Sequence, residues 1–176
     1  MANASIWWKR GLFVLLALVI LFWSLLPLST LPRSWAGPDL LIALTFAWAL
    51  RRPEFVPVLL IAAVMLLADL LLHRPPGLMA FLVVLGAEQL KTRAVGLRDA
   101  SFAGEWAAAG LVVIAVFMLN RVTLAVLMVD QAPLGLTLIQ MVATILIYPI
   151  VVFVSHLFLG VRKLAPGDDD AIGSRI

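Results

Sequence analysis

Six long apolar runs, separated by short polar turns, dominate the pattern of this chain. Within each run the apolar residues are nearly continuous, whereas a strand of a membrane β-barrel alternates apolar and polar positions. Continuous runs are typical of helices that cross a bilayer, because a helix satisfies its own backbone hydrogen bonds. The pattern predicts an all-α, polytopic membrane protein with about six transmembrane helices in a single domain of residues 1–165, over residues 12–31, 38–52, 55–72, 77–91, 102–129 and 134–160.

Two of the predicted spans are short. The apolar parts of the second and fourth runs cover residues 40–50 and 78–90, whereas a span needs about 20 residues. Both reach that length only if flanking residues join the helix and the side chains of Arg51, Arg52 and Lys91 extend to the membrane interface. We favour six spans, and a re-entrant arrangement of these two segments is the alternative.

The composition also indicates that the bilayer is part of the solvent. Hydrophobic residues make up 64% and charged residues 13% of the 176 residues, so a soluble fold would lack polar side chains to cover its surface. There is no cysteine, which excludes disulfides and thiolate chemistry. The two histidines, His73 and His156, lie on opposite sides of the predicted topology. We therefore expect no metal, no cofactor and no catalytic group.

Basic residues predict the orientation. With six spans and a cytoplasmic N-terminus, Arg33 and Arg74 lie outside and Arg121 lies within a span. The residues expected inside are Lys9, Arg10, Arg51, Arg52, Lys91, Arg93, Arg98, Arg162, Lys163 and Arg175. This asymmetry follows the positive-inside rule, so we expect both termini, including a flexible tail of residues 166–176, to be cytoplasmic. A four-span arrangement would obey the same rule.

Asp69 and Arg121 are charged residues expected at membrane depth. Both fall near the outer ends of their spans, where an isolated charge is costly. An ion pair between the two helices would satisfy both. A contact of Asp69 with His73, four residues later on the same helix, is an alternative, and outward extension of Arg121 is another. A direct role in transport or proton relay is the less favoured interpretation.

Other residues suggest helix starts, kinks and contacts. Pro38 and Asp39 are typical of a helix start. Pro149, after Tyr148, should kink the last span and free a carbonyl for a neighbouring helix. The fourth span carries small residues and an acidic residue that could form a docking surface for a partner helix, namely Ala80, Gly86, Ala87 and Glu88. For Glu88, a solvated inner rim is the simpler interpretation.

The order of these features resembles the rod shape-determining protein MreD family of bacteria. The resemblance rests on order and spacing over nearly the whole chain and is strongest from Gly37 to about Arg93. The residues that carry it are Pro38-Asp39, Arg51-Arg52-Pro53, Asp69, Gly77 and Tyr148-Pro149. The chain departs from the family around Asp69, where members often hold glycine before the aspartate and glycine or serine in the following turn.

The resemblance implies a non-catalytic subunit of the cell-wall elongation complex in the bacterial cytoplasmic (inner) membrane. It implies binding to MreC and, through MreC, to MreB, RodA and a class B penicillin-binding protein. The basic loops of the chain are better explained by contact with membrane lipids than with nucleic acid, so we expect lipids but no nucleic acid as further partners. The family is also similar in fold to the S-components of vitamin transporters, so a small-molecule-binding or transport subunit is the alternative. The residues that could contribute to such a cavity are few, namely Asp39, Asp69, Asn120, Arg121 and Gln140.

Overall fold

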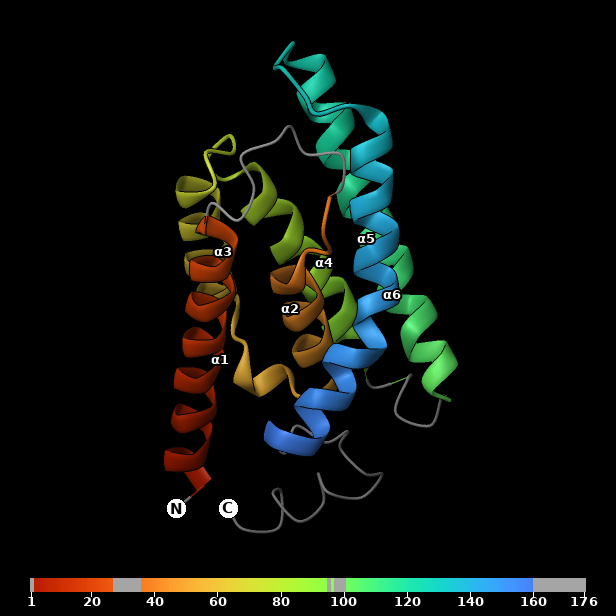
Figure 1. The fold of residues 1–176 in the computed structure, drawn as a ribbon. Helices are drawn as coiled ribbons and strands as arrows, with labels where there is room; N and C mark the ends of the chain where they lie inside the picture. The colour runs from red at the N-terminus through yellow and green to blue at the C-terminus, as the bar shows by residue number, and fades with distance from the viewer. Residues whose placement is uncertain (1, 27–35, 95, 97–100, 160–176) are drawn as a thin grey trace.

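The computed structural model describes residues 2–26, 36–94, 96 and 101–159, and Figure 1 shows a bundle of helices that run in alternating directions. The predicted all-helical fold is confirmed, since no strand occurs among these residues. The elements in chain order are α1 (Ala2–Leu25), α2 (Leu40–Arg51), the short 3₁₀ helix η1 (Pro53–Phe55), α3 (Val58–Leu71), α4 (Leu78–Ala94), α5 (Phe102–Val126) and α6 (Leu134–Leu159).

The helix bounds agree with the predicted spans to within a few residues, except for the first span, because α1 ends at Leu25. There α1 begins at Ala2 rather than at residue 12, because the residues before the apolar run continue the same helix and Ile6 already packs against the core. The predicted segment end at residue 31 and the tail of residues 166–176 lie outside the described residues.

The short helix α2 forms the centre of the bundle. Every residue from Leu41 to Leu50 is buried, and α2 packs mainly against α4 and α6. Its Trp48 ring lies 5.6 Å from the Phe13 ring of α1 and 6.2 Å from the Phe55 ring of η1. The 12 residues of α2 extend about 18 Å at a rise of 1.5 Å each, less than the thickness of a bilayer core.

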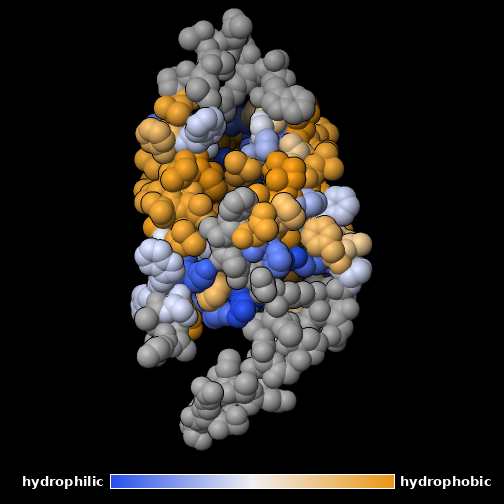
Figure 2. Space-filling model, turned by 60° about the horizontal axis from the view of Figure 1, so that its bottom comes forward, coloured by the Kyte–Doolittle hydropathy of each residue, from blue (hydrophilic) through white to orange (hydrophobic). Residues whose placement is uncertain are grey.

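Within the described residues, three helices are long and apolar enough to cross a membrane by themselves, over Ser5–Leu25, Phe102–Val126 and Leu134–Leu157. Large apolar side chains on these helices are exposed, among them Leu15, Leu111 and Leu146. Figure 2 shows the resulting hydrophobic band, with hydrophilic residues gathered at the end of the molecule that faces the viewer. These features are those of an α-helical membrane protein.

The two ends of the bundle differ. One end, called the basic end here, carries Lys9, Arg10, Arg51, Arg52 and Lys91. Exposed Trp7 and Trp8 lie near this end of α1 and exposed Trp23 lies near the other, as expected for side chains at the two interfaces of a membrane. From Trp7 to Trp23 the helix rises about 24 Å.

At the other end, called the cleft end here, α2 begins deeper in the bundle than its neighbours. The backbone N–H of Asp39, just before α2, donates to the Thr144 hydroxyl in the middle of α6 at 2.9 Å. The ten residues of α6 before Thr144 therefore extend about 15 Å beyond the start of α2. The α5–α6 hairpin is the part of the bundle that reaches furthest from the basic end (Figure 1).

Candidate functional site

Asp39 organises the cleft end. It is the N-cap of α2, and its Oδ1 accepts a hydrogen bond from the N–H of Ile42 at 3.2 Å, which confirms the helix start predicted at Pro38 and Asp39. Its Oδ2 accepts from Nη2 of Arg74 at 3.3 Å. One carboxylate thus joins the start of α2 to the connection between α3 and α4.

Asp69 holds the start of α4. Its side chain is fully buried, and its Oδ2 accepts hydrogen bonds from the N–H groups of Gly77 and Ala80, both at 3.1 Å. These N–H groups lie just before α4 and in its first turn, where the helix itself supplies no acceptor. A residue at the end of α3 therefore caps the next helix, and this contact fixes the α3–α4 hairpin.

The predicted ion pair between Asp69 and Arg121 is wrong. Arg121 instead uses its Nη1 to donate to the Ala132 carbonyl and the Thr137 hydroxyl, each at 3.0 Å. The contact of Asp69 with His73 is wrong as well, because His73 is exposed and follows the last turn of α3 with a φ of 54°. Asp69 instead binds the free N–H groups at the start of the adjacent helix through its Oδ2. Within the described residues, its Oδ1 has no hydrogen-bond partner.

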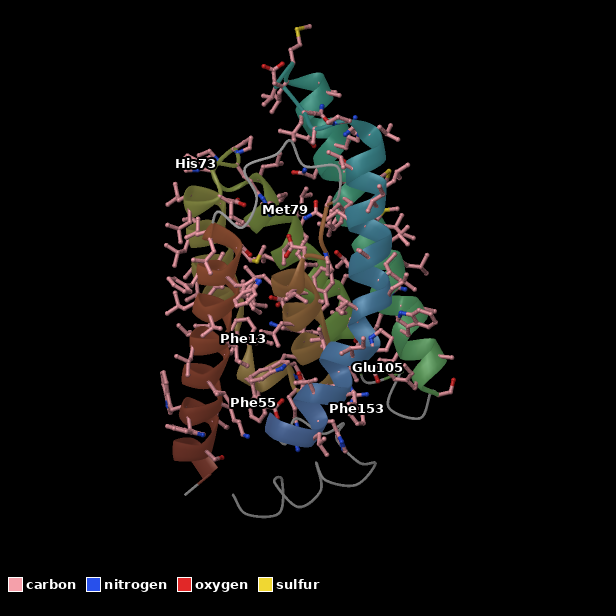
Figure 3. All side chains as sticks on the ribbon, viewed as in Figure 1. Phe13, Phe55, His73, Met79, Glu105 and Phe153 are labelled. Atoms are coloured by element: carbon pink, nitrogen blue, oxygen red, sulfur yellow. The ribbon has the colours of Figure 1, made fainter. Side chains whose placement is uncertain are left out.

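A second polar cluster lies inside the basic end. Arg51 of α2 and Glu105 of α5 form a two-pronged ion pair, with Nε to Oε1 at 2.7 Å and Nη2 to Oε2 at 3.2 Å. The Tyr148 hydroxyl of α6 donates to the same Oε1 at 3.4 Å. Figure 3 shows Glu105 and His73 at opposite ends of the bundle. The cluster joins three helices in a buried environment, where a paired charge is tolerated and an unpaired one is not.

The sequence reasoning missed Glu105. Its signal was present in the sequence, because an acidic residue stands near the start of the fifth apolar run. The predicted topology places that end of the run on the same side of the membrane as Arg51. What the sequence does not reveal is that α5 lies close enough to α2 for the two side chains to meet. A related contact, from Nε1 of Trp48 to Oγ of Ser155 at 3.1 Å, joins α2 to the last turns of α6.

Pro149 frees a backbone carbonyl, as predicted. Proline has no N–H, so the carbonyl of Ile145, four residues earlier, loses its partner within α6. Nε1 of Trp106 on α5 donates to this carbonyl at 2.9 Å. Tyr148 and Pro149 therefore each connect α6 to α5, Tyr148 through Glu105 and Pro149 through Ile145.

The predicted docking surface on α4 is wrong. Ala80, Gly86 and Ala87 are buried inside the bundle, because α4 packs against α2, α3 and α5. A Cβ atom added at Gly86 would lie 2.7 Å from Cγ1 of Val112 and 2.9 Å from Cζ of Phe46. These small residues permit close packing within the chain and are not free to meet a partner.

Glu88 follows the simpler interpretation. Its side chain is 43% exposed, and its Oε1 accepts from Nζ of Lys91 at 2.7 Å. The same ammonium group donates to the carbonyl of Val56 at 2.7 Å. Glu88 and Lys91 thus form part of the polar rim at the basic end and hold the connection between η1 and α3.

Two adjoining cavities open at the cleft end. The larger has a volume of about 770 Å³ and is lined by α1, the starts of α2 and α6, and the end of α3. The smaller, about 260 Å³, lies toward the α5–α6 hairpin. Both are lined by Asp39, His73, Arg74, Ala132, Thr137 and Gln140, so they form one cleft. Among the side chains that the structure describes, no three acidic or histidine residues group as a metal site.

Comparison with protein-family models, curated proteins and solved structures finds no match to this chain. The order of residues that resembles the MreD family, and the geometry above, are therefore the basis for a functional proposal.

Proposed function

We propose that this protein is a non-catalytic, MreD-like subunit of the bacterial cell-wall elongation complex in the cytoplasmic membrane. The observation that carries the proposal is the use of its intramembrane polar side chains. Asp39, Asp69, Arg51, Glu105 and Tyr148 all bind groups of neighbouring helices or connections in the same chain. Polar residues that bind within the chain in this way stabilise its fold. A membrane subunit with such a fold acts by binding other proteins.

The partners follow from the resemblance. The proposal includes binding to MreC and, through MreC, association with MreB, RodA and a class B penicillin-binding protein. The outward apolar faces of the long helices support such contacts, because membrane helices associate by packing. Phe81 and Leu85 on α4 and Phe153 on α6 are exposed examples, and they replace the buried small residues as candidates for partner contact.

Depletion of the protein in its rod-shaped host tests the function. We expect cells to become round and to stop incorporating new wall material along their sides, in rich medium and equally in medium with excess vitamins. The wild-type gene on a plasmid should restore the rod, and MreC should co-purify with the tagged protein in mild detergent. Loss of rod shape that vitamins alone reverse would contradict the proposal.

The alternative, a small-molecule-binding or transport subunit, is favoured by one observation, the cleft with Asp39, Arg74 and Gln140 in its walls. This alternative predicts that supplying the nutrient rescues the depleted cells and restores their normal shape. The same depletion experiment therefore separates the two functions.

The proposed orientation places the basic end in the cytoplasm. Because the chain contains no cysteine, single cysteines can be introduced at Gly77 and Thr92 and treated with a membrane-impermeant thiol reagent in intact cells. We expect labelling at Gly77 alone, since the two residues lie at opposite ends of α4. Labelling at Thr92 and not at Gly77 would reverse the orientation.

A further inference from the structure

The residues that line the cleft are mainly apolar on α1 and α3 and more often polar toward the α5–α6 hairpin. The larger cavity has apolar walls from α1, α2 and α3, including Ile20, Leu21, Leu41, Ala68 and Leu71. More than half of the residues that line the smaller cavity have polar side chains, including Asn120, Arg121, Asp130, Gln131, Thr137 and Gln140. A ligand that fills both must itself have a polar and an apolar part.

Two guanidinium groups face the polar side. Arg74 lies in the connection between α3 and α4, Arg121 lies on α5, and both line the smaller cavity. Arg74 uses its Nη2 on Asp39, and Arg121 uses its Nη1 on Ala132 and Thr137. A guanidinium group has five N–H donors, so each retains donors after these bonds. Paired guanidinium groups are well suited to phosphate oxygens, which they bind through parallel hydrogen bonds.

The acidic residues of the described chain pair with only one of these two arginines. Asp39 neutralises Arg74, whereas Arg121 has no carboxylate partner in the described part of the chain; Asp130, which lines the same cavity, is exposed. An anionic group would therefore supply the charge that Arg121 lacks. The larger cavity of the cleft has a volume of about 770 Å³, which lies within the usual range of volumes for ligand sites.

We propose that this cleft binds a phosphate-headed lipid. The phosphate lies by Arg74 and Arg121, and a hydrocarbon chain lies against the apolar wall formed by Ile20, Leu41 and Leu71. The surrounding bilayer supplies molecules of this chemistry, whereas a polar vitamin would leave that apolar wall unmatched. The inference goes beyond the proposed elongation role, because it depends on the cleft alone and would hold whichever partners the protein has.

Lipid binding to the purified full-length protein tests the inference. The protein is depleted of lipid in a mild detergent and titrated with phosphatidylglycerol, with diacylglycerol of the same chains, or with inorganic phosphate, and retained ligand is counted by native mass spectrometry. We expect saturable binding of phosphatidylglycerol, and weaker binding of the two probes that lack either the phosphate or the chain. Equal binding of diacylglycerol would indicate a nonspecific apolar contact, and equal binding of inorganic phosphate would indicate a plain anion site; either result overturns the proposal.

Substitutions locate the site. Arg121→Gln should weaken phosphatidylglycerol binding by about tenfold or more, as expected for the loss of a charged hydrogen-bonding partner. Arg74→Gln should do the same, but it also removes the partner of Asp39, so Arg121→Gln is the decisive variant. The matched control is Arg93→Gln, an exposed arginine at the basic end, which should bind as the wild type does. Unchanged binding by a folded Arg121→Gln protein would refute the assignment.

Discussion

Replacing Trp106 by phenylalanine removes the indole N–H that satisfies the Ile145 carbonyl, while an aromatic ring remains to pack between α5 and α6. The bond measures 2.9 Å, and its acceptor has no partner within α6 because position 149 is proline. The bond is partly buried, and leaving a carbonyl unsatisfied away from water costs about 1–3 kcal/mol. We expect Trp106→Phe to lower the free energy of unfolding by about 2 kcal/mol.

The Pro149→Ala background isolates this hydrogen bond from the other effects of the substitution. Alanine restores an N–H at position 149, which can donate to the Ile145 carbonyl as in any helix. Trp106→Phe should therefore cost about 1 kcal/mol less in the Pro149→Ala protein than in the wild type. The four proteins of this double-mutant cycle can be compared by heating in mild detergent and measuring the monodisperse fraction by size-exclusion chromatography.

The control is Trp8→Phe, because Trp8 is 72% exposed and the substitution changes the same groups in a lipid-facing position. It should leave stability unchanged in both backgrounds. If Trp106→Phe costs the same with proline and with alanine at position 149, the indole does not compensate for the missing N–H, and the reasoning is refuted.

The same assay tests three further expectations. Gly86→Ala should destabilise the protein by about 1 kcal/mol, because the cost of overpacking exceeds the gain in helix propensity. Gly110→Ala is the control and should be neutral or stabilising, since its Cβ would lie 3.6 Å from the nearest atom. Equal effects of the two substitutions would contradict the packing argument. Glu105→Gln should cost about 3 kcal/mol of stability, because it leaves Arg51 without its counter-charge. The double change of Arg51→Leu with Glu105→Leu should cost less stability than the sum of the two single changes. Additive costs would exclude the ion pair. Met128→Gly should stabilise by about 1 kcal/mol, because Met128 is 93% exposed and has a φ of 55°; a loss of stability would assign that side chain a contact.

The helices could be predicted from the sequence because the apolar runs are long and the turns between them are sharp. The helix start at Asp39 and the carbonyl freed by Pro149 were predictable for a related reason. Both depend on backbone chemistry within a few residues of the side chain, and the sequence contains that information directly.

Contacts between helices were harder to predict. Asp69 was assigned to a distant cation on grounds of charge and depth, but its partners are N–H groups of Gly77 and Ala80 in the next helix. The Pro-Pro-Gly turn that follows could have suggested this contact, since it brings a helix start back toward Asp69. For Gly86 no local signal exists, because a small residue permits close packing equally against a helix of the same chain or of another protein.

The burial of α2 has a consequence for biosynthesis. Its 12 residues are fewer than a segment needs to enter the bilayer on its own, and its main packing partners, α4 and α6, are synthesised later. The nascent segment therefore reaches its final place when the C-terminal half of the chain has entered the membrane. The helix at the centre of the protein is thus the second to leave the ribosome, but its packing is among the last to be completed.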